Sequence, residues 1–284
     1  MRILVTGANG QLGSEIRALA AAQTQHTFCF TDIGELDVCD AQAVREFVFR
    51  ESIDVIVNCA AYTAVDKAEG DTELSRRLNA DAPAYLAAAA AERDAALIQI
   101  STDYVFDGTA CVPYTEAALP HPNSQYGRTK LDGEERALAL CHRCMVIRTA
   151  WLYSPYGSNF VKTMMRLGRE RDSLGVVFDQ VGTPTYAADL ARAILTIIDK
   201  GIERGVYHFS NEGVCSWYDF ARSIHRLAGI SCALTPLHTA DYPTPAARPH
   251  YSVLDKTKIK QTYGIVIPHW EESLTHCIAL LKNE

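Results

Sequence analysis

The sequence has no long uncharged apolar run, no low-complexity tract and no excess of basic residues. Its longest stretches without charge, such as residues 18–31, are shorter than the roughly 18 residues of a membrane-spanning helix and contain Gln, Thr and His. Lys and Arg total 27 against 34 Asp and Glu, so the formal net charge is −7. This balance disfavours broad electrostatic attraction to nucleic acid or anionic lipid, and we expect neither as a partner.

The N-terminus lacks the apolar stretch and the small-residue cleavage site of a secretory signal, since Met1–Val5 leads straight into a strand-like run. We therefore predict a cytoplasmic location. The cysteines number nine, and the CxxC of Cys141 and Cys144 has no second Cys or His pair that would complete a zinc site. We interpret the cysteines as reduced thiols and predict no metal site built on them.

A length of 284 residues corresponds to roughly two domains at about 150 residues each. Residues 1–150 alternate strand-like and helical segments, and two of the strand-like runs, Val55–Val57 and Leu97–Ile100, are nearly continuous apolar stretches typical of buried parallel strands. The predicted fold class is α/β, a Rossmann-type doubly wound parallel sheet. Strands are expected at Ile3–Thr6, Phe28–Thr31, Val55–Asn58, Leu97–Ser101 and Met145–Arg148, and helices at Leu12–Ala22, Ala41–Arg50, Thr72–Arg93 and Ser124–Leu140.

After Trp151 the composition shifts to aromatic residues, Gly and Pro. We predict a smaller C-terminal α/β domain over 151–284 that binds the substrate, with 187–209 forming one further αβ unit that returns to the first domain. Helices in this half are expected at Phe160–Arg171, Ala187–Lys200 and Trp217–Leu227.

A glycine-rich segment, Thr6–Gly13, follows the first strand and opens the first helix. Glycines at such a junction let the backbone approach a pyrophosphate, which the helix N-terminus attracts. Asp32 ends the second strand 19 residues after Gly13, near the offset of about 20 residues at which a carboxylate meets an adenine ribose hydroxyl. The alternatives are an ordinary tight turn for the glycines and a turn cap before Gly34 for Asp32.

Tyr126 and Lys130 stand four apart in a predicted helix and share one face of it. A neighbouring ammonium favours phenolate, so we expect Lys130 to lower the pKa of Tyr126. The preceding strand ends in Ser101–Thr102–Asp103, at the sheet edge where open α/β sheets bind ligands. A solvated helix face is the alternative for the Tyr–Lys pair.

Together these motifs resemble the dTDP-4-dehydrorhamnose reductases, a family of the extended short-chain dehydrogenase/reductase superfamily. The resemblance covers the whole chain. It rests on eight segments in order: TGANGQLG (6–13), VNCAAYTAVDKAE (57–69), STDYVFDG (101–108), YGRTKLDGE (126–134), RTAWLY (148–153), NFVKTM (159–164), DQVGTPT (179–185) and YPTPAARP (242–249).

The resemblance implies reduction of dTDP-4-dehydro-6-deoxy-L-mannose to dTDP-L-rhamnose by NADPH or NADH, for surface polysaccharide. Tyr126 would protonate the sugar oxygen, Lys130 would orient the nicotinamide ribose, and Thr102 would hydrogen-bond the sugar. Cofactor contacts are expected at Gly7, Asn9, Gly10, Gln11, Leu12, Gly13, Asp32, Ala60, Ala61, Tyr62, Thr63, Tyr126 and Lys130. Substrate contacts are expected at Thr102, Asp103, Trp151, Asn159, Lys162 and Arg248.

Two of these assignments have structural alternatives, a surface ion pair for Arg248 and a core aromatic role for Trp151. Family members often carry His at the position of Tyr62, so this chain departs from the family pattern there. The resemblance also allows a homodimer, and Mg²⁺ bound by glutamates at the dimer contact.

Two other functions compete with reduction. A nucleotide-sugar dehydratase or epimerase shares the superfamily, but a dehydratase would carry an acid pair after the strand-end Thr, and here Asp103 is followed by Tyr104. A non-catalytic NADP-binding regulator, like the regulatory subunit of methionine adenosyltransferase, resembles the same family. The presence of Thr102, Tyr126 and Lys130 favours an enzyme.

Overall fold

A six-stranded parallel sheet forms the centre of the computed structural model, which describes residues 1–282. The strand order is β10-β5-β4-β3-β1-β2, and every neighbouring pair is parallel. The strands are β1 (Arg2–Thr6), β2 (Thr27–Thr31), β3 (Val55–Asn58), β4 (Ala96–Thr102), β5 (Cys144–Thr149) and β10 (Gly205–His208). The order reverses between β1 and β3, and such a reversal is where doubly wound sheets bind ligands.

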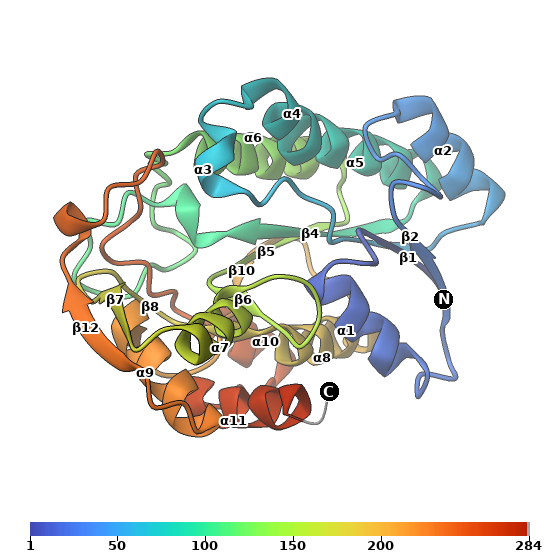
Figure 1. Ribbon diagram of the computed structural model, residues 1–284. Helices are drawn as coiled ribbons and strands as arrows, with labels where there is room; N and C mark the ends of the chain where they lie inside the picture. Colours follow the sequence, from blue (N-terminus) through green and yellow to red (C-terminus); the bar gives the residue numbers. More distant parts are fainter. Residues whose placement is uncertain (283–284) are drawn as a thin grey trace.

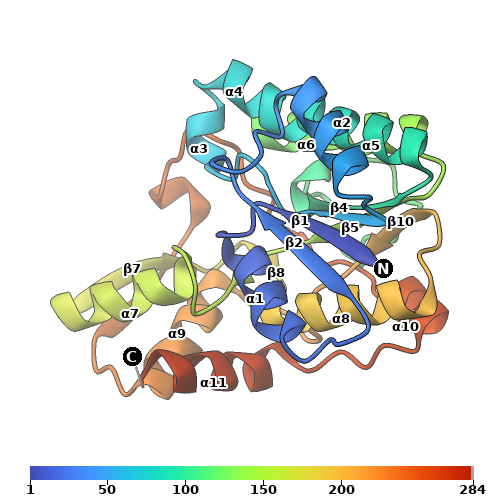
Figure 2. The ribbon, with the colours of Figure 1, turned by 90° about the vertical axis from the view of Figure 1, so that its right-hand side faces the viewer.

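Helices cover both faces of the sheet (Figures 1 and 2). One face carries α2 (Ala41–Arg50), α5 (Ala82–Arg93) and α6 (Gln125–Leu140), and the other carries α1 (Gln11–Ala20), α8 (Ala187–Lys200) and α10 (Thr257–Tyr263). Apolar side chains of both helical layers and of the strands form two buried clusters, one on each face. The predicted α/β fold class is confirmed.

The helix predicted over Thr72–Arg93 is wrong as a single α-helix. It consists of α4 (Thr72–Arg76), a π-helical segment η1 (Arg77–Asp81) and α5. Within η1, the buried Asn79 donates from Nδ2 to Tyr62 O at 3.1 Å and to Thr129 Oγ1 at 3.2 Å. These bonds accompany the local change of helical register, and residue periodicity cannot reveal such a change.

A third layer lies beside the sheet and holds α7 (Phe160–Glu170), α9 (Trp217–Ala228) and α11 (Trp270–Leu281), as Figure 2 shows. Its core gathers Tyr153, Phe220, Ile224, Trp270 and Leu274. Three short two-stranded sheets complete it: β6 (Leu152–Tyr153) with β9 (Thr185–Tyr186), β8 (Val181–Gly182) with β11 (Cys215–Ser216), and β7 (Ser173–Val177) with β12 (Ala233–Leu237). The remaining short helices are α3 (Val65–Ala68), η2 (Asp103–Val105) and η3 (Thr239–Asp241).

Three buried polar side chains form a ladder across the central strands. Thr6 Oγ1 donates to Asn58 Oδ1 at 2.6 Å, and Asn58 Nδ2 donates to Gln99 Oε1 at 2.8 Å. Thr6 and Asn58 are the last residues of β1 and β3, Gln99 lies in the middle of β4, and all three are at most 2% exposed. The ladder joins the ends of β1 and β3 to the middle of β4, and the candidate site is built from the residues that follow these three strands.

Candidate active site

The backbone of the glycine loop after β1 packs so closely against neighbouring backbone that Gly7 and Gly13 leave no room for a side chain. Gly7 has φ +60°, and a Cβ there would lie 2.7 Å from Ala60 N. A Cβ on Gly13 would lie 2.5 Å from Ala8 Cα. Gly10 precedes α1 and is exposed, and no side chain of residues 1–282 caps that helix. The first-turn N–H groups of α1 are therefore open to an anionic ligand.

Asp32, at the end of β2, faces this loop. Its Oδ2 accepts from Asn9 N at 3.0 Å and its Oδ1 accepts from Ile33 N at 2.9 Å. The carboxylate thus lies at the sheet edge next to the glycine loop, and it also caps the local turn, as the alternative interpretation expects.

The segment after β3 approaches the same edge. Asn58 Oδ1 accepts from Ala60 N at 3.2 Å, and Asn79 Oδ1 accepts from Tyr62 N at 2.9 Å. The backbone of 60–62 is therefore anchored at both ends by buried amide side chains, while Thr63 is exposed. Neither Asn58 nor Asn79 is among the predicted site residues, because no sequence motif distinguishes a side chain that holds a loop.

Thr102 and Asp103 follow β4 and are 5% and 2% exposed. Thr102 Oγ1 donates to Asp103 Oδ1 at 3.0 Å and accepts from Tyr104 N at 3.2 Å. Burial raises the pKa of Asp103 to about 6, against the lowering effect of hydrogen bonds from Ser252 and Thr102. The strand-end hydroxyl and carboxyl group therefore form one buried polar pair.

Helix α6 brings Tyr126 and Lys130 to this pair. Ser124 caps the helix, accepting from Gly127 N at 3.1 Å. A Cβ on Gly127 would lie 2.2 Å from Tyr104 O, so glycine allows the helix to touch η2. The Tyr126 ring packs against the Tyr104 ring with centroids 5.5 Å apart, and its phenol is hydrogen-bonded to Thr102. Lys130 Nζ donates to Ile100 O at 2.6 Å.

The electrostatics of the pair differ from the prediction. Burial raises the pKa of Tyr126 to about 12, and the hydrogen bond to Thr102 offsets only part of the rise. Burial lowers the pKa of Lys130 to about 8, with the Glu134 charge opposing the change. The expectation that Lys130 lowers the pKa of Tyr126 is wrong here, because loss of solvent around the phenol outweighs any attraction from the ammonium.

One turn beyond Lys130, Glu134 forms a buried ion pair with Arg148 of β5. Arg148 Nη2 lies 2.6 Å from Glu134 Oε2, and Arg148 Nε donates to both carboxylate oxygens. Both side chains are less than 5% exposed. This pair joins α6 to the sheet and places a negative charge near Lys130. The ion pair is not among the predicted site features, although Glu134 continues the four-residue spacing of Tyr126 and Lys130.

The predicted substrate residues lie on several elements. Trp151 follows β5 with φ +49° and stacks on Trp217 with ring centroids 3.5 Å apart. Arg248 makes a two-pronged ion pair with Asp66, at 3.0 and 2.8 Å, and its hydrogen bonds hold the pKa of Asp66 below the usual value. The structural alternatives, an aromatic stack and an ion pair, are thus both present at these positions.

Of the other two predicted substrate residues, Asn159 connects to the glycine loop, whereas Lys162 bonds the chain just before α7. Asn159 caps α7 and donates to Gln11 Oε1 at 3.0 Å, and Lys162 Nζ donates to Pro155 O at 2.8 Å. Asn159 therefore ties the third layer to the first turn of α1.

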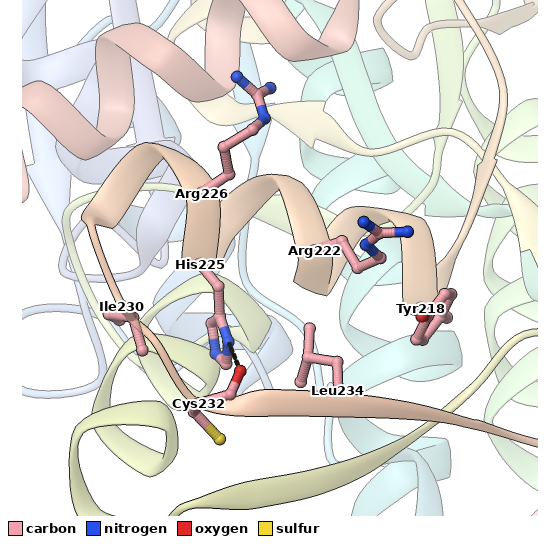
Figure 3. Close-up of a pocket in the computed structure, with 7 residues that line it drawn as sticks. All are labelled: Tyr218, Arg222, His225, Arg226, Ile230, Cys232 and Leu234. Atoms are coloured by element: carbon pink, nitrogen blue, oxygen red, sulfur yellow. Dashed lines mark hydrogen bonds between the residues drawn. The ribbon is translucent and has the colours of Figure 1, made fainter.

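A separate open hollow lies between α9 and β12 (Figure 3). It is lined by Tyr218, Arg222, His225, Arg226, Ile230, Cys232 and Leu234. Both ring nitrogens of His225 face backbone carbonyls, of Met164 and Cys232, and Arg226 pairs with Glu271. None of its lining residues belongs to the glycine loop, the end of β4 or α6, so it is distinct from the candidate site.

Within residues 1–282, no cluster of three or more His, Cys, Asp or Glu side chains could hold a metal ion. None of the helices in that same range combines the length and apolar character needed to cross a bilayer.

Comparison with known proteins identifies the family. A family model described as the RmlD substrate binding domain matches residues 1–283. The chain belongs to the RmlD family. The resemblance found from the sequence motifs is confirmed by curated relatives. This RmlD-family chain is 41% identical to the dTDP-4-dehydrorhamnose reductase of Escherichia coli K12, with 95% of each chain covered, and 40% identical to that of Aggregatibacter actinomycetemcomitans, covering 96% of this chain and 97% of the relative.

Several solved structures superpose closely on this chain. A dTDP-4-dehydrorhamnose reductase from Clostridium acetobutylicum is 48% identical with a TM-score of 0.96, covering 99% of this chain and all of the other. One from Bacillus anthracis, in complex with NADP, is 38% identical with a TM-score of 0.95, covering 98% and 99%. A Thermus thermophilus UDP-glucose 4-epimerase shares the fold at 18% identity and a TM-score of 0.85, covering 99% of both chains. The fold alone therefore does not distinguish reductase from epimerase.

Proposed function

We propose that this protein is an NAD(P)H-dependent reductase that converts dTDP-4-dehydro-6-deoxy-L-mannose to dTDP-L-rhamnose, a precursor for surface polysaccharide. The observation that carries the proposal is the hydrogen-bonded pair of Tyr126 and Thr102, with Lys130 one turn away, at the carboxyl edge of the sheet. It occurs in a chain about 40% identical, over nearly its full length, to named reductases of this substrate.

The residues at the β1–β3 edge fit a dinucleotide. The uncapped first turn of α1 supplies free N–H groups, and the exposed Gly10 lets a pyrophosphate approach them. We assign these contacts to Gly7, Asn9, Gly10, Gln11, Leu12 and Gly13, the ribose contact to Asp32, and the nicotinamide side to Ala60, Ala61, Tyr62 and Thr63. When bound, the reduced nicotinamide supplies the hydride.

Side chains of this protein supply the proton for the sugar oxygen and orient the nicotinamide ribose. Tyr126 is the general acid, and its Oη gives its proton to O4 of the sugar as the C4 carbonyl becomes an alcohol. The raised pKa of about 12 keeps this phenol protonated at neutral pH, which suits a proton donor. Thr102 hydrogen-bonds the same oxygen. Lys130 orients the nicotinamide ribose, with its ammonium held near the end of β4 by Ile100 O.

The nucleotide-sugar contacts are assigned to Asp103, Trp151, Asn159, Lys162 and Arg248. Arg248 offers the planar fork that suits a diphosphate, and here that fork is occupied by Asp66. We therefore expect the diphosphate to compete with Asp66 for Arg248. The left-handed backbone of Trp151 costs of order 1–3 kcal/mol, a cost typical of residues held for function.

The organisation around this site is also part of the proposal. We assign residues 1–150 and 187–209 to the dinucleotide-binding unit, which α10 also joins because Ile259 and Tyr263 pack in the core of the central sheet. The rest of 151–284 is assigned to the substrate unit, whose residues 283 and 284 lie outside the described part. We further propose a cytoplasmic homodimer. No set of carboxylates within 1–282 marks a Mg²⁺ site, and the proposed chemistry uses none.

The test is to mix the protein with dTDP-4-dehydro-6-deoxy-L-mannose and either NADPH or NADH. Absorbance of the reduced nicotinamide should fall in step with the formation of dTDP-L-rhamnose, identified by NMR. Binding of dinucleotide without any reduction of this sugar would instead favour a regulatory role. Co-purification of a stoichiometric synthetase would be further support for a regulatory subunit.

A further inference from the structure

The adenosine side of the proposed dinucleotide site carries two acidic side chains. Asp32 faces the glycine loop through Asn9 N, and Glu35 Oε2 accepts from Asp32 N at 2.9 Å. Carboxylates here suit the ribose hydroxyls of NADH, but they repel the dianionic 2′-phosphate of NADPH. Use of NADPH therefore requires a cation close to Asp32.

Arg17 of α1 is that cation. Its guanidinium lies over the Phe30 ring, 4.9 Å from the centroid, and its Nη2 lies 3.4 Å from Asn9 Oδ1. Asn9 thus contacts both charges, Arg17 through its side chain and Asp32 through its backbone N–H. The guanidinium and the carboxylate flank the same exposed residue of the glycine loop.

The guanidinium is free to take a ligand. Among the ion pairs formed within residues 1–282, none involves Arg17, and its one hydrogen bond there is the long contact to Asn9. The side chain is exposed, and contact with the Phe30 ring restricts where it can go. An arginine held in this way loses less conformational freedom when it binds a phosphate than a fully mobile one.

We propose that Arg17 binds the 2′-phosphate of NADPH, whereas Asp32 binds the adenine ribose hydroxyls of NADH, so that one site accepts both cofactors. This inference rests on the proposed function, because it assumes a dinucleotide on the glycine loop. The hydrogen bond from Arg17 to Asn9 is long, at 3.4 Å, and therefore weak. Arg17 can exchange it for two short charge-assisted bonds to phosphate oxygens. Arg17 then offsets the repulsion from Asp32 and Glu35.

The test uses binding to the full-length protein, measured by calorimetry with NADP⁺ and NAD⁺, and with the fragments 2′,5′-ADP and 5′-ADP. Arg17→Gln removes the charge and keeps an amide that can contact Asn9. We expect it to weaken NADP⁺ and 2′,5′-ADP about tenfold while NAD⁺ and 5′-ADP change less than twofold. Arg17→Lys keeps the charge without the fork and should fall between the two.

Arg45→Gln is the matched control, because Arg45 also lies over a phenylalanine ring, Phe49, but on α2. It should leave all four affinities unchanged. If Arg17→Gln weakens ligands with and without the 2′-phosphate equally, or changes no affinity, the proposed role of Arg17 is wrong and the proposed function is unaffected. Failure of the wild-type protein to bind any of the four ligands would overturn the proposed function as well.

Discussion

At the scale of single residues, burial decides the protonation state of Tyr126. With a pKa of about 12, the phenol stays protonated across the neutral range. Tyr126→Phe keeps the ring packed on Tyr104 and removes the proton. We expect turnover of the keto sugar to fall about 10²-fold or more, the size expected for loss of a positioned general acid, while calorimetry finds unchanged dinucleotide affinity.

Tyr104→Phe is the control for this variant, since Tyr104 packs on Tyr126 and its hydroxyl has no assigned step. Near-normal turnover by Tyr126→Phe would show that another group donates the proton.

The pH dependence should follow Lys130. Its pKa of about 8 means that the ammonium is charged below that pH and neutral above it. Turnover should therefore decline as pH rises through about 8, well below the pKa of Tyr126. Glu134 raises the pKa of Lys130, so Glu134→Gln should move the alkaline limb of the kcat/KM profile to lower pH.

Glu135→Gln, at the exposed neighbouring position, should leave that limb in place. Glu134→Gln also leaves Arg148 buried without its carboxylate, which typically costs about 3–5 kcal/mol, so the profile must be recorded where the variant is still folded. If the alkaline limb stays at the same pH in Glu134→Gln, a group other than Lys130 causes the decline in kcat/KM.

At the scale of elements, the position of α6 depends on its contact with η2. Gly127→Ala gains helix propensity of up to about 1 kcal/mol. The new Cβ, however, would lie 2.2 Å from a backbone oxygen of Tyr104, which no rotamer change can relieve. Overpacking of this kind costs about 1–3 kcal/mol and moves Tyr126 away from Thr102. We expect a lower Tm and a fall in kcat, measured by calorimetry and steady-state kinetics.

Gly34→Ala provides the comparison, because a Cβ at Gly34 meets nothing within 4 Å. Full activity in Gly127→Ala would mean that α6 tolerates displacement and that its close approach to η2 is unimportant.

The elements with strong local signals were predictable from the sequence. Helices α2 and α8 have the predicted bounds, and α6 begins at its Ser124 cap. The missed elements depend on distant contacts. The π segment η1 contains Asn79, which bonds Tyr62 and Thr129. Helices α10 and α11 were not expected, because they lie in a region rich in turns, where hydrophobic periodicity is a weak guide.

At the scale of the whole molecule, one buried network holds the third layer to the sheet. Asp189 of α8 accepts from Asn211 at 2.7 Å and from Ser273 of α11 at 2.5 Å. Ser273→Ala removes a buried hydrogen bond to a charged group, worth about 1.5–3 kcal/mol. At about 2–4 °C per kcal/mol for a chain of this size class, Tm should fall by several degrees while KM for the sugar is unchanged.

Thr275→Ala, an exposed position on the same helix, should change Tm by less than 1 °C by the usual size of surface effects. A Tm unchanged in Ser273→Ala would mean that α11 is held by its apolar face alone.

The sequence motifs were enough to predict where the parts of the candidate site lie. They were not enough to predict which charged side chains pair there or how the pKa values shift. The order of glycine loop, strand-end hydroxyl and Tyr–Lys pair places all of them at one sheet edge, because the carboxyl ends of parallel strands share an edge. Asp66 opposite Arg248, and Arg148 opposite Glu134, stand 182 and 14 residues from their partners. Pairings of this kind, and the burial that sets each pKa, depend on packing.

The polar ladder across β1, β3 and β4 has a consequence for how the chain folds. Its two bonds join residues 52 and 41 positions apart in the sequence, so long loops must close before either bond forms. Until the strands are in register, burying Thr6, Asn58 or Gln99 leaves polar atoms without partners and is unfavourable. A nascent chain therefore gains little from docking β1 on β3 alone. The three strands should acquire protection from amide hydrogen exchange together, only after residue 99 has been synthesised.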